Sequence, residues 1–362
     1  MHTDMPTFII AEAGVNHNGD LNLAKQLIDV AAEAGASAAK FQTFQAEQVV
    51  SRHAPKAEYQ TRTTDQTESQ FEMIQKLELT ETDHEVLIAH AQVRGIAFLS
   101  TPFDMPSLHL LTKRFGLQMV KIPSGEIINA PFLLAIARVA QQVILSTGMS
   151  TLAEVEAALG MLAFGFATQS AATPQHGDFE RAFASEAGQQ ALRNRVTLLH
   201  CTTEYPTPFD EVNLRAMDTL AAAFGLPVGY SDHTLGIHVS LAAVARGARV
   251  IEKHLTLDRN LPGPDHKASL EPDELRQLVR QIREIEQALG DGIKRPMASE
   301  WKNRDVARKS LVAAKAIKVG EVFTEENLTC KRPGTGANPS SYWQTLGQAA
   351  TRSYAADEAL DG

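Results

Sequence analysis

Two hydrophobic patterns alternate along most of the chain. Short runs of consecutive apolar residues, typical of strands buried on both faces, are separated by longer stretches in which apolar residues recur every three or four positions. Residues 19–36 show the second pattern, with Leu21, Ala24, Ile28 and Ala31 on one helical face. The short runs number eight and lie at residues 7–14, 38–44, 97–102, 119–125, 143–149, 196–201, 227–233 and 250–256.

This alternation predicts an α/β fold with a parallel sheet that is covered by helices on both faces. Eight strand–helix units within about 290 residues favour a (β/α)₈ TIM barrel over an open doubly wound sheet. No G-x-G-x-x-G pattern follows the first run, which disfavours a dinucleotide-binding sheet. Two segments are too long for simple connections. We expect residues 45–80 to pass over one mouth of the barrel and the polar residues 168–195 to form a mobile surface excursion.

The pattern changes after Gly292, where a polar stretch with few apolar anchors follows. We therefore predict a barrel domain over residues 1–292, a linker over 293–308 and a small C-terminal domain over 309–362. A domain of that size has little core of its own and needs to dock against another surface.

Composition excludes several classes of protein. With 43 acidic and 34 basic residues the net charge is −9, which argues against a protein that binds nucleic acid over its whole surface. Two cysteines, Cys201 and Cys330, form no C-x-x-C pair and indicate a reducing compartment. The N-terminus does not resemble a signal peptide, and the longest apolar stretch, 157–167, is too short to cross a bilayer. We expect a soluble cytoplasmic protein without a membrane partner.

Polar residues gather at the ends of the predicted strands, where barrel enzymes place their sites. Lys40 and Gln42 lie two apart on one strand and therefore share a face, and Lys121 lies in another strand. Two lysines and several hydroxyls converging on one barrel mouth would not be stable in a dry interior without an anion. The pattern predicts a phosphate or carboxylate pocket. Its candidate hydroxyl groups are Thr101, Ser124, Ser146, Thr203 and Ser231.

Two histidines end consecutive strands, His233 after the seventh run and His254 in the eighth. Their imidazoles could meet at one point and bind a divalent metal ion, with water and substrate as the other ligands. From spacing alone, two structural histidines are an equally good interpretation. Glu12 and Asp265 are the best candidates for acid–base chemistry.

Nine motifs in the chain resemble, in order, those of the sialic acid synthases, the family of N-acetylneuraminate synthase and its relatives. They are IIAEAGVNHNGD, AAKFQTF, STPFD, KIPSGEI, ILSTGM, LLHCTTEYPTP, GYSDHTLG, IEKHLTLD and PGPDHKASLEPDEL. The later motif KRPGTG is similar to one in the antifreeze-like (SAF) domain that ends these enzymes.

The resemblance implies that phosphoenolpyruvate condenses with an N-acyl mannose-type aldose, giving phosphate and a nine-carbon 2-keto sugar acid. It implies phosphoenolpyruvate binding by Lys40, Thr101, Lys121, Ser124, Ser146, Thr203 and Ser231. It implies sugar binding by Glu12, Gln42, Glu126, Tyr205, Asp265 and Arg332. Catalysis would rest on Glu12 and His233, and His233 and His254 would bind manganese, with magnesium or cobalt as alternatives.

In this family Arg332 reaches the sugar's acyl group from the other subunit, so the resemblance also implies a domain-swapped homodimer. Thr203 stands where some members have asparagine, which affects one expected phosphate contact.

We expect N-acetylmannosamine as the acceptor, and 2,4-diacetamido-2,4,6-trideoxymannose, the precursor of N,N'-diacetyllegionaminic acid, as the alternative. A Schiff-base aldolase using Lys40 or Lys121 would leave the two histidines unexplained. A non-catalytic sugar-binding protein would leave the polar strand ends unexplained.

Overall fold

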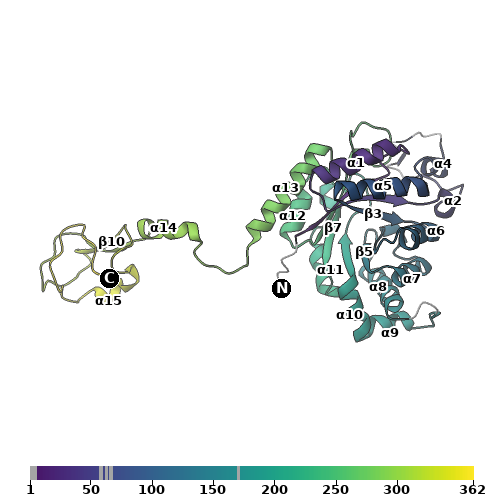
Figure 1. Cartoon of the computed structure of the whole chain (residues 1–362). Coiled ribbons are helices and arrows are strands. Elements are labelled where there is room, and N and C mark those ends of the chain that lie inside the picture. Colours follow the sequence, from purple (N-terminus) through teal and green to yellow (C-terminus); the bar gives the residue numbers. More distant parts are fainter. Residues whose placement is uncertain (1–5, 57–59, 62–63, 65–67, 169–171) are drawn as a thin grey trace. The chain divides into compact units, whose positions relative to one another are not determined.

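The structure is a computed structural model that describes residues 6–56, 60–61, 64, 68–168 and 172–362. Contacts within the chain divide it into two compact units, Met1–Gly290 and Asp291–Gly362. The first unit contains the parallel sheet and its helices, and the second contains a small antiparallel pair (Figure 1).

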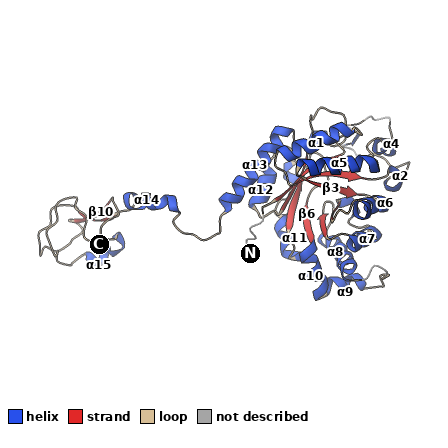
Figure 2. Cartoon of the chain, viewed as in Figure 1, coloured by secondary structure: helices blue, strands red, loops and turns tan. Residues whose placement is uncertain are grey.

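Eight parallel strands form the sheet of the first unit (Figure 2). They are β1 (Phe8–Gly14), β2 (Ala38–Thr43), β3 (Ala97–Pro102), β4 (Met119–Ile122), β5 (Gln142–Ser146), β6 (Val196–His200), β7 (Val228–Asp232) and β8 (Val250–His254). They pair in the order β3-β2-β1-β8-β7-β6-β5-β4, and β3 also contacts β4. This arrangement confirms the predicted TIM barrel.

Helices follow the strands and cover the outside of the sheet. They are α1 (Leu21–Glu33), α5 (Glu81–Arg94), α6 (Met105–His109), α7 (Ala130–Val139), α8 (Leu152–Ala167), α10 (Glu186–Arg195), α11 (Ala216–Phe224), α12 (His238–Ala245) and α13 (Pro272–Leu289). Side-chain caps define where several of them begin. Thr80 and Asp83 form a reciprocal capping box on α5, and Thr151 and Glu154 do the same on α8. Gly95 ends α5 in the left-handed conformation, at φ 69°.

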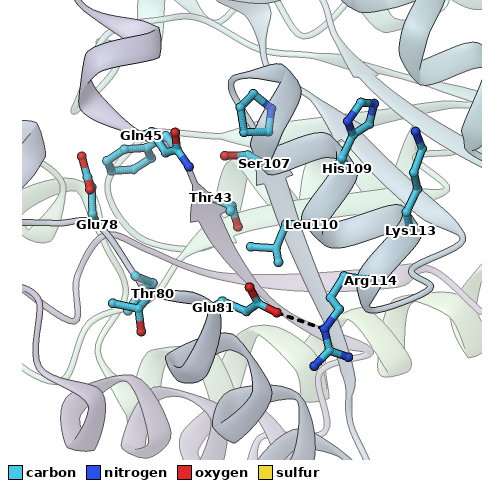
Figure 3. A pocket seen from close by; sticks show the side chains of 13 residues that line it. Thr43, Gln45, Glu78, Thr80, Glu81, Ser107, His109, Leu110, Lys113 and Arg114 are labelled. Atoms are coloured by element: carbon cyan, nitrogen blue, oxygen red, sulfur yellow. Dashed lines mark hydrogen bonds and ion pairs between the residues drawn. The ribbon is translucent and has the colours of Figure 1, made fainter.

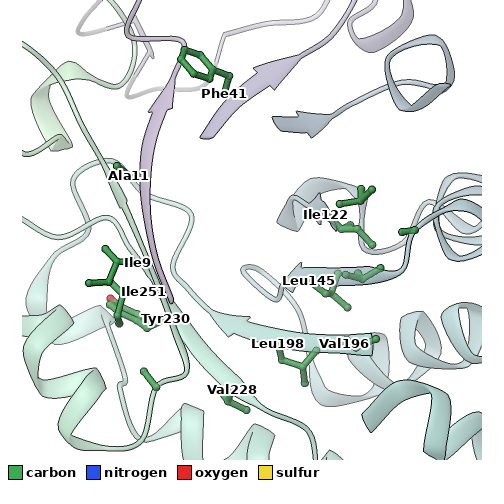
Figure 4. Packing of buried hydrophobic residues seen from close by; sticks show 14 of the residues in the cluster. Ile9, Ala11, Phe41, Ile122, Leu145, Val196, Leu198, Val228, Tyr230 and Ile251 are labelled. Carbon is green, nitrogen blue, oxygen red and sulfur yellow. The ribbon is translucent and has the colours of Figure 1, made fainter. Parts of the chain in front are cut away.

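Side chains alternate along each strand between the helices and the barrel interior. Residues such as Ile9, Phe41, Tyr230 and Ile251 pack in the large core beneath the helices (Figure 4). The intervening residues form a separate apolar cluster inside the barrel: Ile10, Ala38, Leu99, Ile144, Leu199 and Val250. The next inward-facing residue after Ile10, Ala38 and Val250 is charged in each case. These residues are Glu12, Lys40 and Glu252. The carboxyl ends of the strands therefore hold a polar interior above an apolar base.

Both long connections contain helices. The connection after β2 contains α2 (Ala46–Val49) and α4 (Gln70–Gln75). In the polar segment expected to be mobile, α9 (Asp178–Ala184) and α10 pack on α8. The ring of Phe179 meets that of Phe164 edge-on, with centroids 5.6 Å apart. Leu192 is also buried in the main core, and Phe183 packs against it. Residues 169–171 of this segment lie outside the described residues, and the rest of it packs on the barrel instead of forming the expected mobile excursion.

The second unit begins with α14 (Ala298–Ala307), a helix in the segment where the sequence predicts a linker. β9 (Ser310–Ala313) and β10 (Leu328–Lys331) then pair antiparallel, and the short helix α15 (Tyr342–Thr345) follows. The unit has its own small core of eight buried residues, among them Leu311, Phe323 and Tyr354. Within the described part of the chain, none of the helices in either unit has the length and apolar character to cross a membrane.

Candidate active site

A cavity of about 520 Å³ opens at the carboxyl ends of the barrel strands. All but two of the predicted site residues line it, although they come from all eight strands or the segments that follow them. Those lining it are Glu12, Lys40, Gln42, Thr101, Lys121, Ser124, Ser146, Thr203, Tyr205, Ser231, His233, His254 and Asp265.

Two lysines and two glutamates form a buried charge network on the cavity floor. The ammonium of Lys40 lies 2.6 Å from Glu12 Oε2 and 3.6 Å from Glu252 Oε2, and it donates to Thr101 Oγ1 at 3.0 Å. Lys121 Nζ lies 3.5 Å from the other oxygen of Glu252, to which Ser231 donates at 2.8 Å. Because the four charged side chains are at most 5% exposed, their mutual attraction is only weakly screened by water.

The two glutamates have opposite pKa shifts. Burial raises the pKa of Glu12 to about 7, although Lys40 lowers it. Burial also disfavours the charged form of Glu252, but Lys121 and Lys40 together bring the pKa of that carboxyl down to about 2. Glu252 is thus the permanent anion between the lysines, and Glu12 is the group that can take or give a proton near neutral pH.

Glu252 is a site residue to which the sequence analysis assigned no role. A signal for it was available, since Glu252 lies two residues before His254 on one strand and must share its face. Cys201 also lines the cavity, where its thiol lies 3.2 Å from Ser124 Oγ.

The rings of the two histidines are neighbours in the cavity lining, with centroids 5.5 Å apart and planes at 64°. His233 Nδ1 lies 2.7 Å from the carbonyl oxygen of Thr202, to which it donates, so Nε2 keeps its lone pair. Burial lowers the pKa of His233 to about 4, and it lowers the pKa of His254 well below its ordinary value. Both rings are therefore neutral at physiological pH, which is the form that binds metals.

The donor set resembles an open metal site. Among the described residues there is no group of three or more His, Cys, Asp or Glu side chains arranged around one metal position. His254 Nδ1 is buried without a hydrogen-bond partner and lies 3.7 Å from Asp265 Oδ2. Two neutral imidazoles fit a divalent ion whose remaining ligands are water and substrate oxygens.

Behind the histidines, a second ion pair supports the strand ends. Lys253 and Asp232 point away from the cavity, are fully buried and lie 3.1 Å apart. Asp232 also accepts from Thr234 N, Thr234 Oγ1 and Ser240 Oγ, at 2.6–2.9 Å. These bonds fix the turn that carries His233, and the sequence analysis did not foresee them.

Replacing Lys253 with methionine is expected to destabilise the barrel by about 3–5 kcal/mol, because Asp232 would remain buried without its counter-charge. The urea midpoint should fall accordingly. Lys113→Met, at an exposed position, is the matched control. An unchanged midpoint in Lys253→Met would show that the pair does not support the fold.

The remaining cavity wall carries hydroxyl groups. Ser146 Oγ is buried without a hydrogen-bond partner, and Ser124 Oγ accepts from the backbone N–H of Gly148 at 3.0 Å. A Cβ at Gly148 would lie 2.5 Å from Thr203 Oγ1, so only glycine allows this close approach. The ring of Tyr205 lies against that of His233, with centroids 4.1 Å apart and planes tilted by 33°. Burial raises the pKa of Asp265, which also lines the cavity, to about 6.

Two predicted residues do not line the cavity. Glu126 lies in a 3-10 turn after β4, where its carboxylate accepts from Asn129 Nδ2 at 2.6 Å. Arg332 is exposed in the second unit, directly after β10.

A second cavity of about 640 Å³ lies between the end of β2 and α6 (Figure 3). Its lining includes Lys113 and Arg114, and Arg114 is paired with Glu81. Within the described part of the chain, it contains none of the predicted site residues, and Phe44 is the one residue that lines both cavities. The chemistry therefore belongs to the cavity at the strand ends.

Comparison with known proteins matches this fold and site. The NeuB family corresponds to residues 27–294 and the SAF domain to residues 308–361. The chain is 55% identical to the N,N'-diacetyllegionaminic acid synthase of Campylobacter jejuni subsp. jejuni serotype O:2, over 98% of both chains. It is 45% identical to the N,N'-diacetyllegionaminic acid synthase of Legionella pneumophila, over 95% of this chain and 90% of the relative. The fold also matches a solved structure, the crystal structure of N-acetylneuraminic acid (sialic acid) synthetase from Leptospira borgpetersenii in complex with citrate. The two chains align with a TM-score of 0.65 and 36% sequence identity, over 83% of this chain and 90% of that chain.

The chain belongs to the NeuB family. This confirms the family expected from the motifs, the barrel and the C-terminal SAF domain. It also confirms the enzyme class, a phosphoenolpyruvate-dependent sugar-acid synthase that forms a carbon–carbon bond.

Proposed function

We propose that the protein condenses phosphoenolpyruvate with 2,4-diacetamido-2,4,6-trideoxymannose, giving N,N'-diacetyllegionaminic acid and phosphate. The observation that carries the proposal is identity of 55% and 45%, over nearly the full chain, to two relatives named as synthases of that product. These relatives favour the alternative acceptor over N-acetylmannosamine, the acceptor expected first. A human N-acetylneuraminate-9-phosphate synthase is more distant, at 33% identity.

In this proposal the cavity floor holds phosphoenolpyruvate. Lys40 and Lys121 supply positive charge, and Thr101, Ser124, Ser146, Thr203 and Ser231 supply hydrogen bonds to phosphate and carboxylate oxygens. Ser146 Oγ supports this role, because a buried hydroxyl without a partner is costly unless a ligand satisfies it. Gln42, Tyr205 and Asp265 would bind the acceptor beside it. Glu126 would reach the acceptor only if its turn moved.

The reaction forms a bond between the enol carbon of phosphoenolpyruvate and the aldehyde carbon of the open-chain sugar. The aldehyde oxygen takes a proton, water adds at the carbon that carries the phosphate, and the C–O bond breaks to release phosphate. Glu12, whose buried carboxyl changes charge near neutral pH, is the proposed proton donor and acceptor. The pairing of Lys40 with Glu12 and Glu252 raises the pKa of Lys40 despite burial, which disfavours that lysine as a Schiff-base nucleophile.

A divalent metal ion, proposed to be manganese, would be held by His233 and His254 and would polarise the aldehyde as a Lewis acid. The hydrogen bond from His233 Nδ1 to Thr202 orients that ring for the role.

Phosphate release from phosphoenolpyruvate tests the proposal. It should require manganese, stop with chelator and be faster with 2,4-diacetamido-2,4,6-trideoxymannose than with N-acetylmannosamine. Faster release with N-acetylmannosamine would make the protein a sialic acid synthase. No release with either sugar, together with borohydride trapping of a lysine, would make it an aldolase.

We also propose a homodimer in which the C-terminal unit of one copy serves the barrel of the other. Its support is a set of exposed apolar side chains that all follow the carboxyl ends of β3 to β7, around the mouth of the site. They are Met105, Ile128, Met149, Leu152, Phe209 and Leu235. Apolar residues gathered in this way are typical of an interface. Light scattering should give twice the 39.4 kDa of one chain.

Arg332→Ala is expected to raise the KM for the acceptor by roughly 10- to 100-fold, because a hydrogen bond from a charged group is lost. The KM for phosphoenolpyruvate should stay unchanged. Lys315→Ala, an exposed position in the same unit, is the control. If the two variants had equal acceptor kinetics, Arg332 would have no part in the site.

A further inference from the structure

One wall of the active-site cavity is apolar, in contrast to its charged floor. It is formed by Phe44, Val49, Val50, Met73, Ile74 and Leu77, all from the connection between β2 and α5. We call these six residues the apolar wall.

The apolar wall is built into the fold. Phe44 and Leu77 form a buried cluster with Val15, against which Val49 and Ile74 pack. Local hydrogen bonds fix the backbone on both sides, since Ala46 N donates to Glu78 Oε1 at 2.6 Å and Ser69 forms a capping box with Glu72 on α4. The wall is therefore already present before a substrate enters.

No charged side chain from this connection lines the cavity, among the residues that the structure describes. Of the described residues in this connection, the polar ones that line the cavity are two neutral amides, Gln60 and Gln70. Among the described residues, the cationic side chains of the lining are Lys40 and Lys121, which come from strands on the floor. The six side chains of the apolar wall offer no hydrogen bond, so a free hydroxyl placed against them would lose its hydration without a compensating partner, and neither neutral amide would neutralise a phosphate.

The chemistry places the far end of the acceptor away from the floor. Its aldehyde carbon must meet phosphoenolpyruvate among the lysines and histidines, and C6 lies five bonds further along the open chain, roughly 6 Å away at ordinary C–C bond lengths. In the proposed acceptor, C6 is a methyl group.

We propose that the apolar wall binds the C6 methyl group of the acceptor and selects 6-deoxy sugars over their 6-hydroxy counterparts. This inference rests on the proposed function and adds the residues that determine acceptor specificity. An apolar surface discriminates against one added hydroxyl by roughly 10- to 100-fold, which is the preference expected here.

The test uses two acceptors that differ only at C6: 2,4-diacetamido-2,4,6-trideoxymannose and 2,4-diacetamido-2,4-dideoxymannose. The wild-type enzyme with manganese should prefer the first in kcat/KM by at least about tenfold. Val50→Thr adds a hydroxyl without changing shape and should reduce the preference at least about threefold, and Met73→Gln should reduce it about tenfold. The changes should appear in the acceptor KM, with the KM for phosphoenolpyruvate within about twofold of wild type.

Val93→Thr is the matched control, because Val93 is 84% exposed on α5 and the substitution is the same as at Val50. It should keep the wild-type preference. If Met73→Gln fails to fold, the shape-conserving Val50→Thr decides the question.

Equal kcat/KM for the two acceptors in the wild-type enzyme would overturn this inference alone, since phosphate release would still support the proposed function. An unchanged preference in folded Val50→Thr and Met73→Gln would also overturn it. Release with neither acceptor would overturn the proposed function and this inference together.

Discussion

Replacing His233 with alanine is expected to lower phosphate release from phosphoenolpyruvate by about 1,000-fold or more. The imidazole is one of two neutral rings in the cavity lining, with centroids 5.5 Å apart, and its loss would leave His254 as the only histidine available to a metal ion. A Lewis acid contributes several kcal/mol of transition-state stabilisation, and each 1.36 kcal/mol corresponds to a factor of ten in rate. Steady-state kinetics with manganese measure the loss of rate. The manganese content of the purified variant measures the loss of metal binding.

His109→Ala is the control for this experiment, because His109 is exposed and lines only the second cavity. It should keep wild-type activity and metal content. Full turnover by the His233 variant, or by the wild-type enzyme with chelator, would exclude the proposed metal role. A variant that keeps its manganese but not its activity would instead assign His233 a role in contacting the substrate.

Replacing Glu12 with glutamine is expected to lower kcat by roughly 100- to 10,000-fold, the usual contribution of a positioned acid or base. Glutamine keeps the shape of the side chain but cannot transfer a proton. The present carboxyl lies 2.6 Å from Lys40, and burial raises its pKa to about 7, so both of its forms are populated near neutral pH. Rapid-quench measurement of phosphate formation separates this chemical step from product release.

The Glu12 variant should keep its manganese, which distinguishes it from the His233 variant. Glu47→Gln, an exposed position on α2, controls for the change of charge. A fall in kcat of less than about tenfold would contradict the proton-transfer role and leave Glu12 as a partner that positions Lys40.

Much of the fold and the candidate site could be predicted because strands and barrel mouths follow simple periodic rules. Lys40 and Gln42 had to share a face since side chains alternate along a strand, and the ends of parallel strands had to meet at one mouth. The same rule would have placed Glu252 beside His254. The helices at 178–195 could not be predicted, because their few apolar anchors, Phe179, Phe183 and Leu192, are a weak signal in a polar segment.

The sequence by itself determined the barrel, the two-unit organisation and which residue types stand at the strand ends. These depend on local periodicity and on the fixed geometry of parallel strands. Only the tertiary structure decided how these groups pair: Glu252 between two lysines, Lys253 with Asp232 behind the histidines, and Glu126 turned toward Asn129. The physical reason is that burial and charge partners set these interactions, and both depend on which distant strands become neighbours when the sheet closes.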